Sequence, residues 1–98
     1  MINMTSSTDL KIIRETPARF TWGAVQYIHD IGPYTIVEYT DKNNGATMFQ
    51  VYVNGKSTSN STATLDGAIL LAVAWRNLGA SEAPTMARGA CRLLGVKE

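Results

Sequence analysis

The feature that most constrains the fold is an uncharged apolar stretch with a helix signal at each end. Thr64 can cap the first turn of a helix, and Asp66 places a negative charge near the positive end of the helix dipole. Arg76 stands in the last turn, and Gly79 can adopt the left-handed conformation that ends a helix. Between these signals, residues 67–75 carry no charge. The sequence therefore predicts one helix between the two caps.

This helix lacks the polar face that a surface helix shows in its middle turns. It is also too short to cross a bilayer, which takes about 20 consecutive apolar residues. We therefore expect the helix to be buried on most sides, by a sheet, a second helix or a partner subunit.

Composition indicates a globular chain with part of its surface covered. The 98 residues match the size of one domain, and 45% of them are hydrophobic. Only 17% are charged, which is low against about 25% in an average domain. Together with the apolar helix, this favours a homo-oligomer over a compact monomer. The net charge of +1 gives no electrostatic support for binding duplex nucleic acid or an anionic membrane.

The ends of the chain and its single cysteine bear on the compartment. Cys91 has no partner for an intrachain disulfide, so a reducing compartment such as the cytoplasm is expected. The N-terminus lacks a basic region followed by an apolar run, so no signal peptide is expected.

Residues 1–8 are rich in Ser and Thr and are expected to form a loose arm. Asp9–Glu15 is compatible with a short strand or with one helical turn.

The segment Thr16–Gly32 has two interpretations. One is a helix with Thr16 as its cap and Pro17 at its first position. The other is a strand over Ala24–Asp30 that turns through Gly32-Pro33 into the next strand. Aromatic and β-branched residues favour the strand. A sheet without it would be close to a two-stranded hairpin, which is marginally stable in water. We therefore predict the strand.

Two further strands are predicted over Tyr34–Thr40 and Met48–Val53, joined by a hairpin loop at Asp41–Gly45. The second of these strands alternates, and its better core face consists of Phe49, Val51 and Val53. Asn54-Gly55 is another turn signal, and it can lead into a short edge strand at Lys56–Thr58. Almost every residue of Ser57–Thr64 is Ser, Thr or Asn, which predicts a surface loop.

A second helix is predicted from about Pro84 to Leu94, because Pro84 suits a first turn and Gly95 can end the helix. The predicted fold class is therefore α+β. It has a small antiparallel sheet of three to four strands followed by two C-terminal helices. We expect residues 1–98 to form a single domain.

Groups that perform chemistry are sparse. His29 stands beside Asp30 and is expected to be a strand-end or turn residue, because no nucleophile signature accompanies it. Cys91 would need His29 as its base and is expected to be buried as a small apolar residue. One His and one Cys give no zinc spacing. We therefore expect no enzymatic activity, no metal and no cofactor.

The remaining polar groups suit a planar anionic ligand. Arg88 and Arg92 are four residues apart and share one helix face, and Arg76 ends the first helix. Arginine can bind phosphate through two parallel hydrogen bonds. Phe49 can stack on a base, and Asn60 can recognise a polar edge. The structural alternatives are a core position for Phe49, a solvated face for the two paired arginines, and a helix-dipole contact for Arg76.

This order of elements resembles the Thoeris anti-defence sponge proteins encoded by phages, with Phe49, Asn60 and Arg76 spread across the sheet–helix junction. The resemblance implies an oligomer that does no chemistry and sequesters cyclic ADP-ribose signals, and in some members cyclic oligonucleotides. It implies that Phe49 stacks on adenine, Asn60 reads a polar edge and Arg76 holds phosphate. It also implies that Arg88 and Arg92 lie at a subunit junction, and that the protein acts in the host cytoplasm.

A different class of function fits the sequence as well. A small phage protein of the anti-CRISPR type would inhibit a host defence protein by binding to it, and short length with an exposed hairpin suits that role. The net charge of +1 argues only against an inhibitor that imitates nucleic acid. A structural or assembly subunit without a ligand is a third interpretation.

Overall fold

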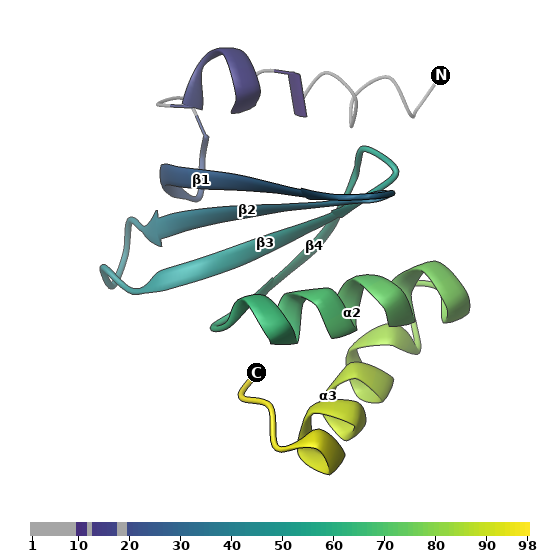
Figure 1. The fold of residues 1–98 in the computed structure, drawn as a ribbon. Coiled ribbons are helices and arrows are strands. Elements are labelled where there is room, and N and C mark those ends of the chain that lie inside the picture. Colours follow the sequence, from purple (N-terminus) through teal and green to yellow (C-terminus); the bar gives the residue numbers. More distant parts are fainter. Residues whose placement is uncertain (1–9, 12, 18–19) are drawn as a thin grey trace.

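The computed structural model describes residues 10–11, 13–17 and 20–98. In this part of the chain, a four-stranded antiparallel sheet lies between a helical N-terminal segment on one face and two C-terminal helices on the other (Figure 1). The strands pair in chain order, each with the next. The predicted α+β class is confirmed. The arm predicted over residues 1–8 lies outside the described residues.

The sheet is a meander of strands β1 (Gly23–Ile31), β2 (Tyr34–Asp41), β3 (Thr47–Val53) and β4 (Lys56–Thr62). The strand interpretation of Thr16–Gly32 is thereby confirmed. Two of the hairpins have two-residue turns, and the residues with positive φ stand where such turns need them. Gly32 has φ of 60°, while Asn54 and Gly55 have φ of 52° and 80°. Positive φ at both central residues is the type I′ pattern that Asn-Gly favours.

The sequence prediction for β4 is wrong in its extent. Residues predicted as a surface loop after Thr58 continue the strand as far as Thr62. The pairing is irregular, because Tyr52 lies opposite Ser57 and Gln50 lies opposite Ser61, which leaves a bulge between them. Ser59 lies in this bulge with φ of 60°.

Hydrogen bonds from hydroxyl groups explain why so polar a segment pairs with the sheet. The Thr58 hydroxyl donates to the Val51 carbonyl at 2.9 Å. Gln50 is fully buried; its amide nitrogen donates to Ser57 at 2.9 Å, and its carbonyl oxygen accepts from Ser61 at 2.8 Å. Satisfied polar groups can be buried at low cost, so β4 needs no alternation of apolar residues to hold its place at the sheet edge.

Both predicted helices are present. Helix α2 covers Leu65–Leu78, and the Thr64 side chain accepts a hydrogen bond from the Gly67 amide at 3.0 Å. Gly79 follows with φ of 86°. Helix α3 covers Ala83–Leu94 and is followed by Gly95 in the left-handed conformation. The capping signals in the sequence therefore located all four helix ends to within one or two residues.

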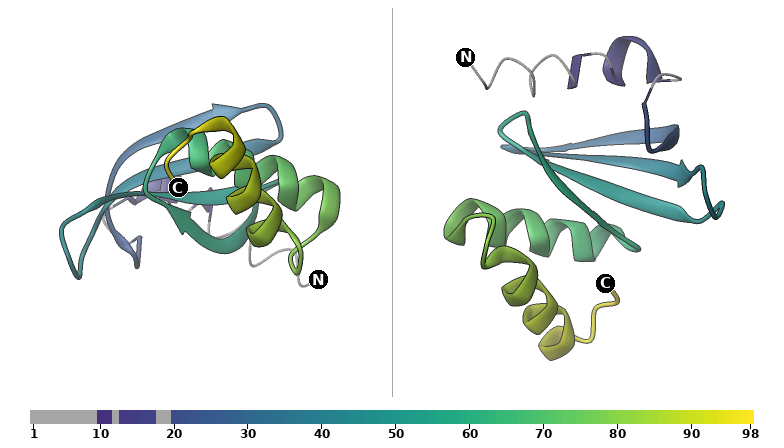
Figure 2. Two further views of the ribbon diagram at one scale, coloured as in Figure 1. Left: turned by 90° about the horizontal axis from the view of Figure 1, so that it is seen from below. Right: turned by 180° about the vertical axis from the view of Figure 1, so that it is seen from behind.

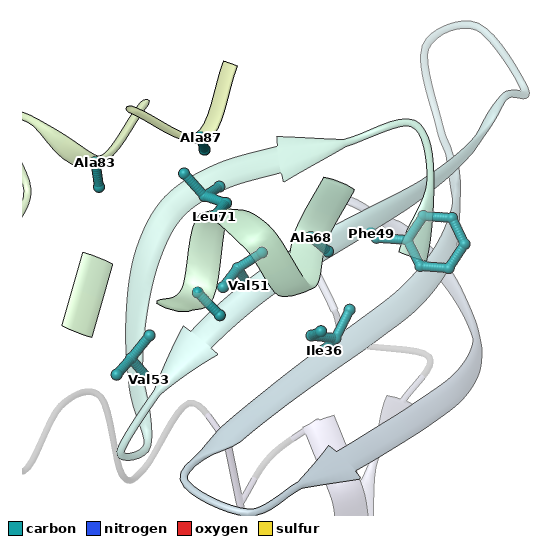
Figure 3. Packing of buried hydrophobic residues seen from close by; sticks show 9 residues of the cluster. Ile36, Phe49, Val51, Val53, Ala68, Leu71, Ala83 and Ala87 are labelled. Atoms are coloured by element: carbon teal, nitrogen blue, oxygen red, sulfur yellow. The ribbon is translucent and has the colours of Figure 1, made fainter. Parts of the chain in front are cut away.

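The main core lies between the sheet and α2. Side chains of β2 and β3 point toward Ala68 and Leu71 on α2 (Figure 3). The buried residues of this cluster are Ile36, Phe49, Val51, Val53, Ala68, Leu71, Ala72, Ala83 and Ala87. The members from α3 are both alanines, and such small side chains let α3 pack closely on the outer side of α2.

Helix α2 is covered on two sides rather than on most sides. The sheet covers one side and α3 another, and Leu71 is only 5% exposed. The remaining side faces outward, where Val73 is 37% exposed. The expectation of burial is thus confirmed for the sheet and the second helix, and burial of the third side by a partner subunit stays a prediction. No helix in the described ranges is long and apolar enough to span a membrane.

The opposite face of the sheet carries a second core under the N-terminal segment. Leu10, Lys11 and residues 13–15 are helical, which is one of the two forms expected for this region. Ile13 and Phe20 pack there with Val37, Tyr39 and Tyr52. Arg14 and Asp30 form two hydrogen bonds of 3.1 and 2.5 Å across this contact. The Arg14 guanidinium lowers the pKa of the Asp30 carboxyl, chiefly through these bonds.

Replacing Leu71 by Asp should destabilise the fold by about 3 kcal/mol or more, because an unpaired charge would be buried between the sheet and α3. Thermal unfolding should show a melting temperature at least about 10 °C lower. Val73→Asp, two residues away on the exposed side, is the matched control and should cost less than about 1 kcal/mol. Equal stability of the two variants would contradict the placement of α2.

Candidate ligand-binding site

A pocket of about 150 Å³ opens where β4 meets the two helices and the segment after α3. Its polar residues are Asn60, Ser61 and Thr62 on β4, Arg88 on α3 and Glu98. Its remaining wall is formed by small and apolar residues, among them Gly67, Leu71, Ala87 and Cys91. The pocket therefore combines one cation, one anion and an amide with an apolar side.

The bulge in β4 positions Asn60. Its side-chain amide nitrogen donates to the Thr58 carbonyl at 2.8 Å, and its backbone amide donates to the Thr58 hydroxyl at 3.2 Å. These two bonds fix the amide at the pocket wall. Among the described residues, no partner is found for its carbonyl oxygen, so this atom can accept a hydrogen bond from a ligand.

Gly67 allows the segment after α3 to lie against the first turn of α2. A Cβ atom at this position would stand 3.1 Å from the Lys97 carbonyl oxygen and 3.3 Å from the Glu98 Cα. The Thr64 hydroxyl, besides capping α2, donates to the Lys97 carbonyl. The Ala63 amide donates to the Glu98 carbonyl at 2.5 Å. These contacts bring Glu98 to the rim of the pocket.

The Arg88–Glu98 ion pair is long and exposed. The guanidinium Nε lies 3.7 Å from the Glu98 carboxylate, and the two side chains are 50% and 57% exposed. A charge-assisted hydrogen bond is normally about 2.7–2.9 Å long. Exposed pairs of this kind contribute about 0–1 kcal/mol to stability. The guanidinium can therefore turn to another anion at low cost.

Cys91 is a neutral part of the pocket wall. Its side chain is buried, as the sequence predicted. Burial raises the pKa of the thiol, and the nearby Glu98 carboxylate raises it further. A thiol of raised pKa is a poor nucleophile at neutral pH.

The structure brings two of the five predicted site residues together. Asn60 and Arg88 both line the pocket. Arg92 is exposed one turn further along α3 and is not among the residues that line it. Arg76 lies in the last turn of α2, about 14 Å along the helix axis from Gly67. Phe49 is 9% exposed and belongs to the core between the sheet and α2, which matches its structural alternative.

Sequence reasoning missed a second polar cluster on β1 and β2. His29 Nε2 lies 2.9 Å from a Glu38 carboxylate oxygen, and the exposed ring of Tyr27 meets the imidazole edge-on at 4.6 Å between centroids. Only the register reveals this contact, because Tyr27 pairs with Glu38 and His29 lies on the same face. Within the described ranges, no group of three His, Cys, Asp or Glu residues could hold a metal ion.

Comparison with protein-family models, with curated proteins and with solved structures finds no match for this chain.

Alkylation of Cys91 should report whether Glu98 covers the pocket. With iodoacetamide at pH 8, the folded protein should react at least about tenfold more slowly than the denatured chain, because burial and a raised thiol pKa both oppose reaction. Gly67→Ala should accelerate the reaction severalfold by displacing residues 97–98. Gly89→Ala, where an added Cβ meets only open space, is the control and should change nothing. An unchanged rate in Gly67→Ala would contradict the packing of this segment.

Proposed function

We propose that this protein is a non-enzymatic binding protein that sequesters a small nucleotide-derived signal and holds the phosphate of that ligand at Arg88. The observation that carries the proposal is the meeting of Arg88 and Asn60 around one pocket with an apolar wall. An arginine offers two parallel donors to phosphate, and an amide offers an acceptor to a base or ribose.

In this proposal the phosphate of the ligand replaces the Glu98 carboxylate as the partner of the Arg88 guanidinium. The 3.7 Å separation and the exposure of both side chains indicate that breaking the Arg88–Glu98 pair costs little free energy. A phosphate at the same place can accept two parallel hydrogen bonds from the guanidinium, which the long contact with Glu98 does not provide. Glu98 thus acts as an internal competitor for the ligand.

The size of the pocket limits which part of the ligand it holds. Pockets that enclose a whole drug-sized molecule measure about 300–1,000 Å³. A pocket of about 150 Å³ suits one phosphate-bearing part of a cyclic nucleotide, with the rest lying outside it. In this proposal Arg88 takes the phosphate role that the family resemblance assigned to Arg76.

The ligand class comes from the resemblance to phage sponge proteins, and so does a place of action in the host cytoplasm. Cyclic ADP-ribose and cyclic trinucleotides are the probes to use. The alternative, an inhibitor that binds a host defence protein, predicts no affinity for either probe.

Calorimetric titration of each probe tests the proposal with three matched variants. Arg88→Ala should weaken binding by about tenfold to a hundredfold, because a charge-assisted bond to phosphate contributes about 1.5–3 kcal/mol. Glu98→Gln should tighten binding by removing the competing carboxylate. Arg76→Ala, which lies away from the pocket, should bind like the wild type.

The outcomes separate the function from the site. A wild type that binds neither probe at high micromolar concentration contradicts the sequestering function. A wild type that binds, with Arg88→Ala binding equally well, contradicts the site. Arg88→Ala and Glu98→Gln should retain the wild-type melting temperature, since both side chains are exposed.

A further inference from the structure

The buried amide of Gln50 bridges an irregular part of β4. Gln50 is fully buried; its amide nitrogen donates to Ser57 at 2.9 Å, and its carbonyl oxygen accepts from Ser61 at 2.8 Å. An extended strand would hold residues four apart about 13 Å from each other. One amide group with a hydrogen bond at each end does not reach that far. Strand β4 is therefore shortened between Ser57 and Ser61, and Gln50 joins the two ends of the shortened stretch.

The shortened stretch consists of Thr58, Ser59 and Asn60, and we call these residues the β4 bulge. The pairs that flank the bulge leave its three residues facing a single residue of β3, Val51. Ser59 has φ of 60°, a left-handed conformation that residues other than Gly adopt uncommonly. Such a conformation persists only where the surrounding structure holds it. Bulges re-aim side chains and are frequent next to functional sites.

Hydrogen bonds along β4 connect Gln50 to Asn60. The Ser57 hydroxyl oxygen that accepts from Gln50 also accepts from the Ser59 backbone amide at 3.1 Å. Asn60 is bonded to Thr58 twice, through its backbone amide at 3.2 Å and its side-chain amide at 2.8 Å. The Thr58 hydroxyl is in turn bonded to a carbonyl of β3. The position of the Asn60 side chain thus depends on the shape of the whole bulge.

Gln50 acts from the side of the sheet that faces away from the pocket. Phe49, Val51 and Val53 belong to the core under α2, so the alternation of β3 places Gln50 on the opposite face. Asn60 lines the pocket and Gln50 does not. Seen from behind, β4 runs from the sheet to the start of α2 (Figure 2). A change in the path of β4 therefore moves one wall of the pocket relative to the helices.

The network around Gln50 is fully hydrogen-bonded. Ser61, which donates to Gln50, is also bonded to the Tyr39 hydroxyl at 2.8 Å. An apolar side chain could fill a buried position such as this one without any partner. A satisfied polar network instead rigidifies its surroundings and specifies one arrangement of them. The arrangement that Gln50 specifies is the β4 bulge.

We propose that Gln50 is a positioning residue of the ligand-binding site. Its amide holds the β4 bulge in the shape that presents the Asn60 carbonyl oxygen to the pocket. That oxygen accepts a hydrogen bond from an amino or hydroxyl group of the ligand. The effect of Gln50 on binding rests on the proposed function, whereas its effect on the bulge does not.

NMR of the Asn60 side-chain amide tests the shape of the bulge without a ligand. In the wild type, the amide proton bonded to Thr58 should exchange slowly with solvent. Gln50→Met removes the bridge, and Ser57→Ala removes the acceptor that Gln50 and Ser59 share. Each variant should accelerate the exchange at least about tenfold, because the bulge loses the bonds that fix it.

Two controls separate this effect from general destabilisation. Ser57→Thr keeps the hydroxyl and should exchange like the wild type. Val53→Ala loosens the core on the other face of β3 and should lower the melting temperature without changing the exchange of the Asn60 amide. If Gln50→Met does not fold, Ser57→Ala decides the matter alone. Wild-type exchange in Ser57→Ala overturns the proposed role of Gln50.

Calorimetric titration with cyclic ADP-ribose tests whether the bulge acts through Asn60. Ser57→Ala and Asn60→Ala should each weaken binding by about tenfold, because each misplaces or removes one hydrogen bond to the ligand. The double variant should bind no more weakly than Asn60→Ala, since the position of an amide matters only while the amide is present. Additive losses would show that Ser57 does not act through Asn60 and would overturn the positioning role.

The outcomes also keep this role apart from the proposed function. Faster exchange of the Asn60 amide in Ser57→Ala, with a wild type that binds neither cyclic ADP-ribose nor cyclic trinucleotides, contradicts only the proposed function. A wild type that binds one of these probes, with the Asn60 amide unaffected in Ser57→Ala, contradicts only the role of Gln50.

Discussion

The packing of α2 between the sheet and α3 is the contact on which the rest of the structure depends. Leu71, Ala68 and Ala72 are almost fully buried there, and they join the strands to the helix pair in one core. The small side chains of α3 keep it close to α2, and that closeness brings Arg88 within reach of β4. Without this contact the pocket would lose one of its walls, since its residues come from both helices and from β4.

Local signals in the sequence predicted much of this fold. Thr64 and Gly79 mark the ends of α2 because capping depends on neighbouring residues alone, and Asn54-Gly55 specifies its turn for the same reason. The alternation in β3 placed Phe49, Val51 and Val53 on the helix side. The extent of β4 could not be predicted this way. Its pairing rests on hydroxyl groups that bond to Gln50 and Val51, and these contacts depend on the register of another strand.

The candidate site was harder to predict than the fold, because its members are distant in sequence. Asn60 and Arg88 meet only because α3 folds back along α2. Glu98 reaches the pocket because the Ala63 amide donates to its carbonyl and the Thr64 hydroxyl donates to the carbonyl of Lys97. No sequence motif predicts these contacts. The His29–Glu38 pair likewise follows from a hairpin register with a bulge after Val25. Residue types alone indicated which chemistry the chain contains, but not which groups would be neighbours.

The meander order of the sheet has a consequence for how the chain folds. Each strand pairs with the strand that follows it, and the two helices pack as consecutive elements. Short loops therefore close at little entropic cost, and proteins with such local topology fold rapidly. The docking of residues 97–98 beside Thr64 spans a longer stretch of chain, yet it joins only elements that have already formed. Assembly can thus proceed from hairpins to the helix pair, with the wall formed by Glu98 completed last.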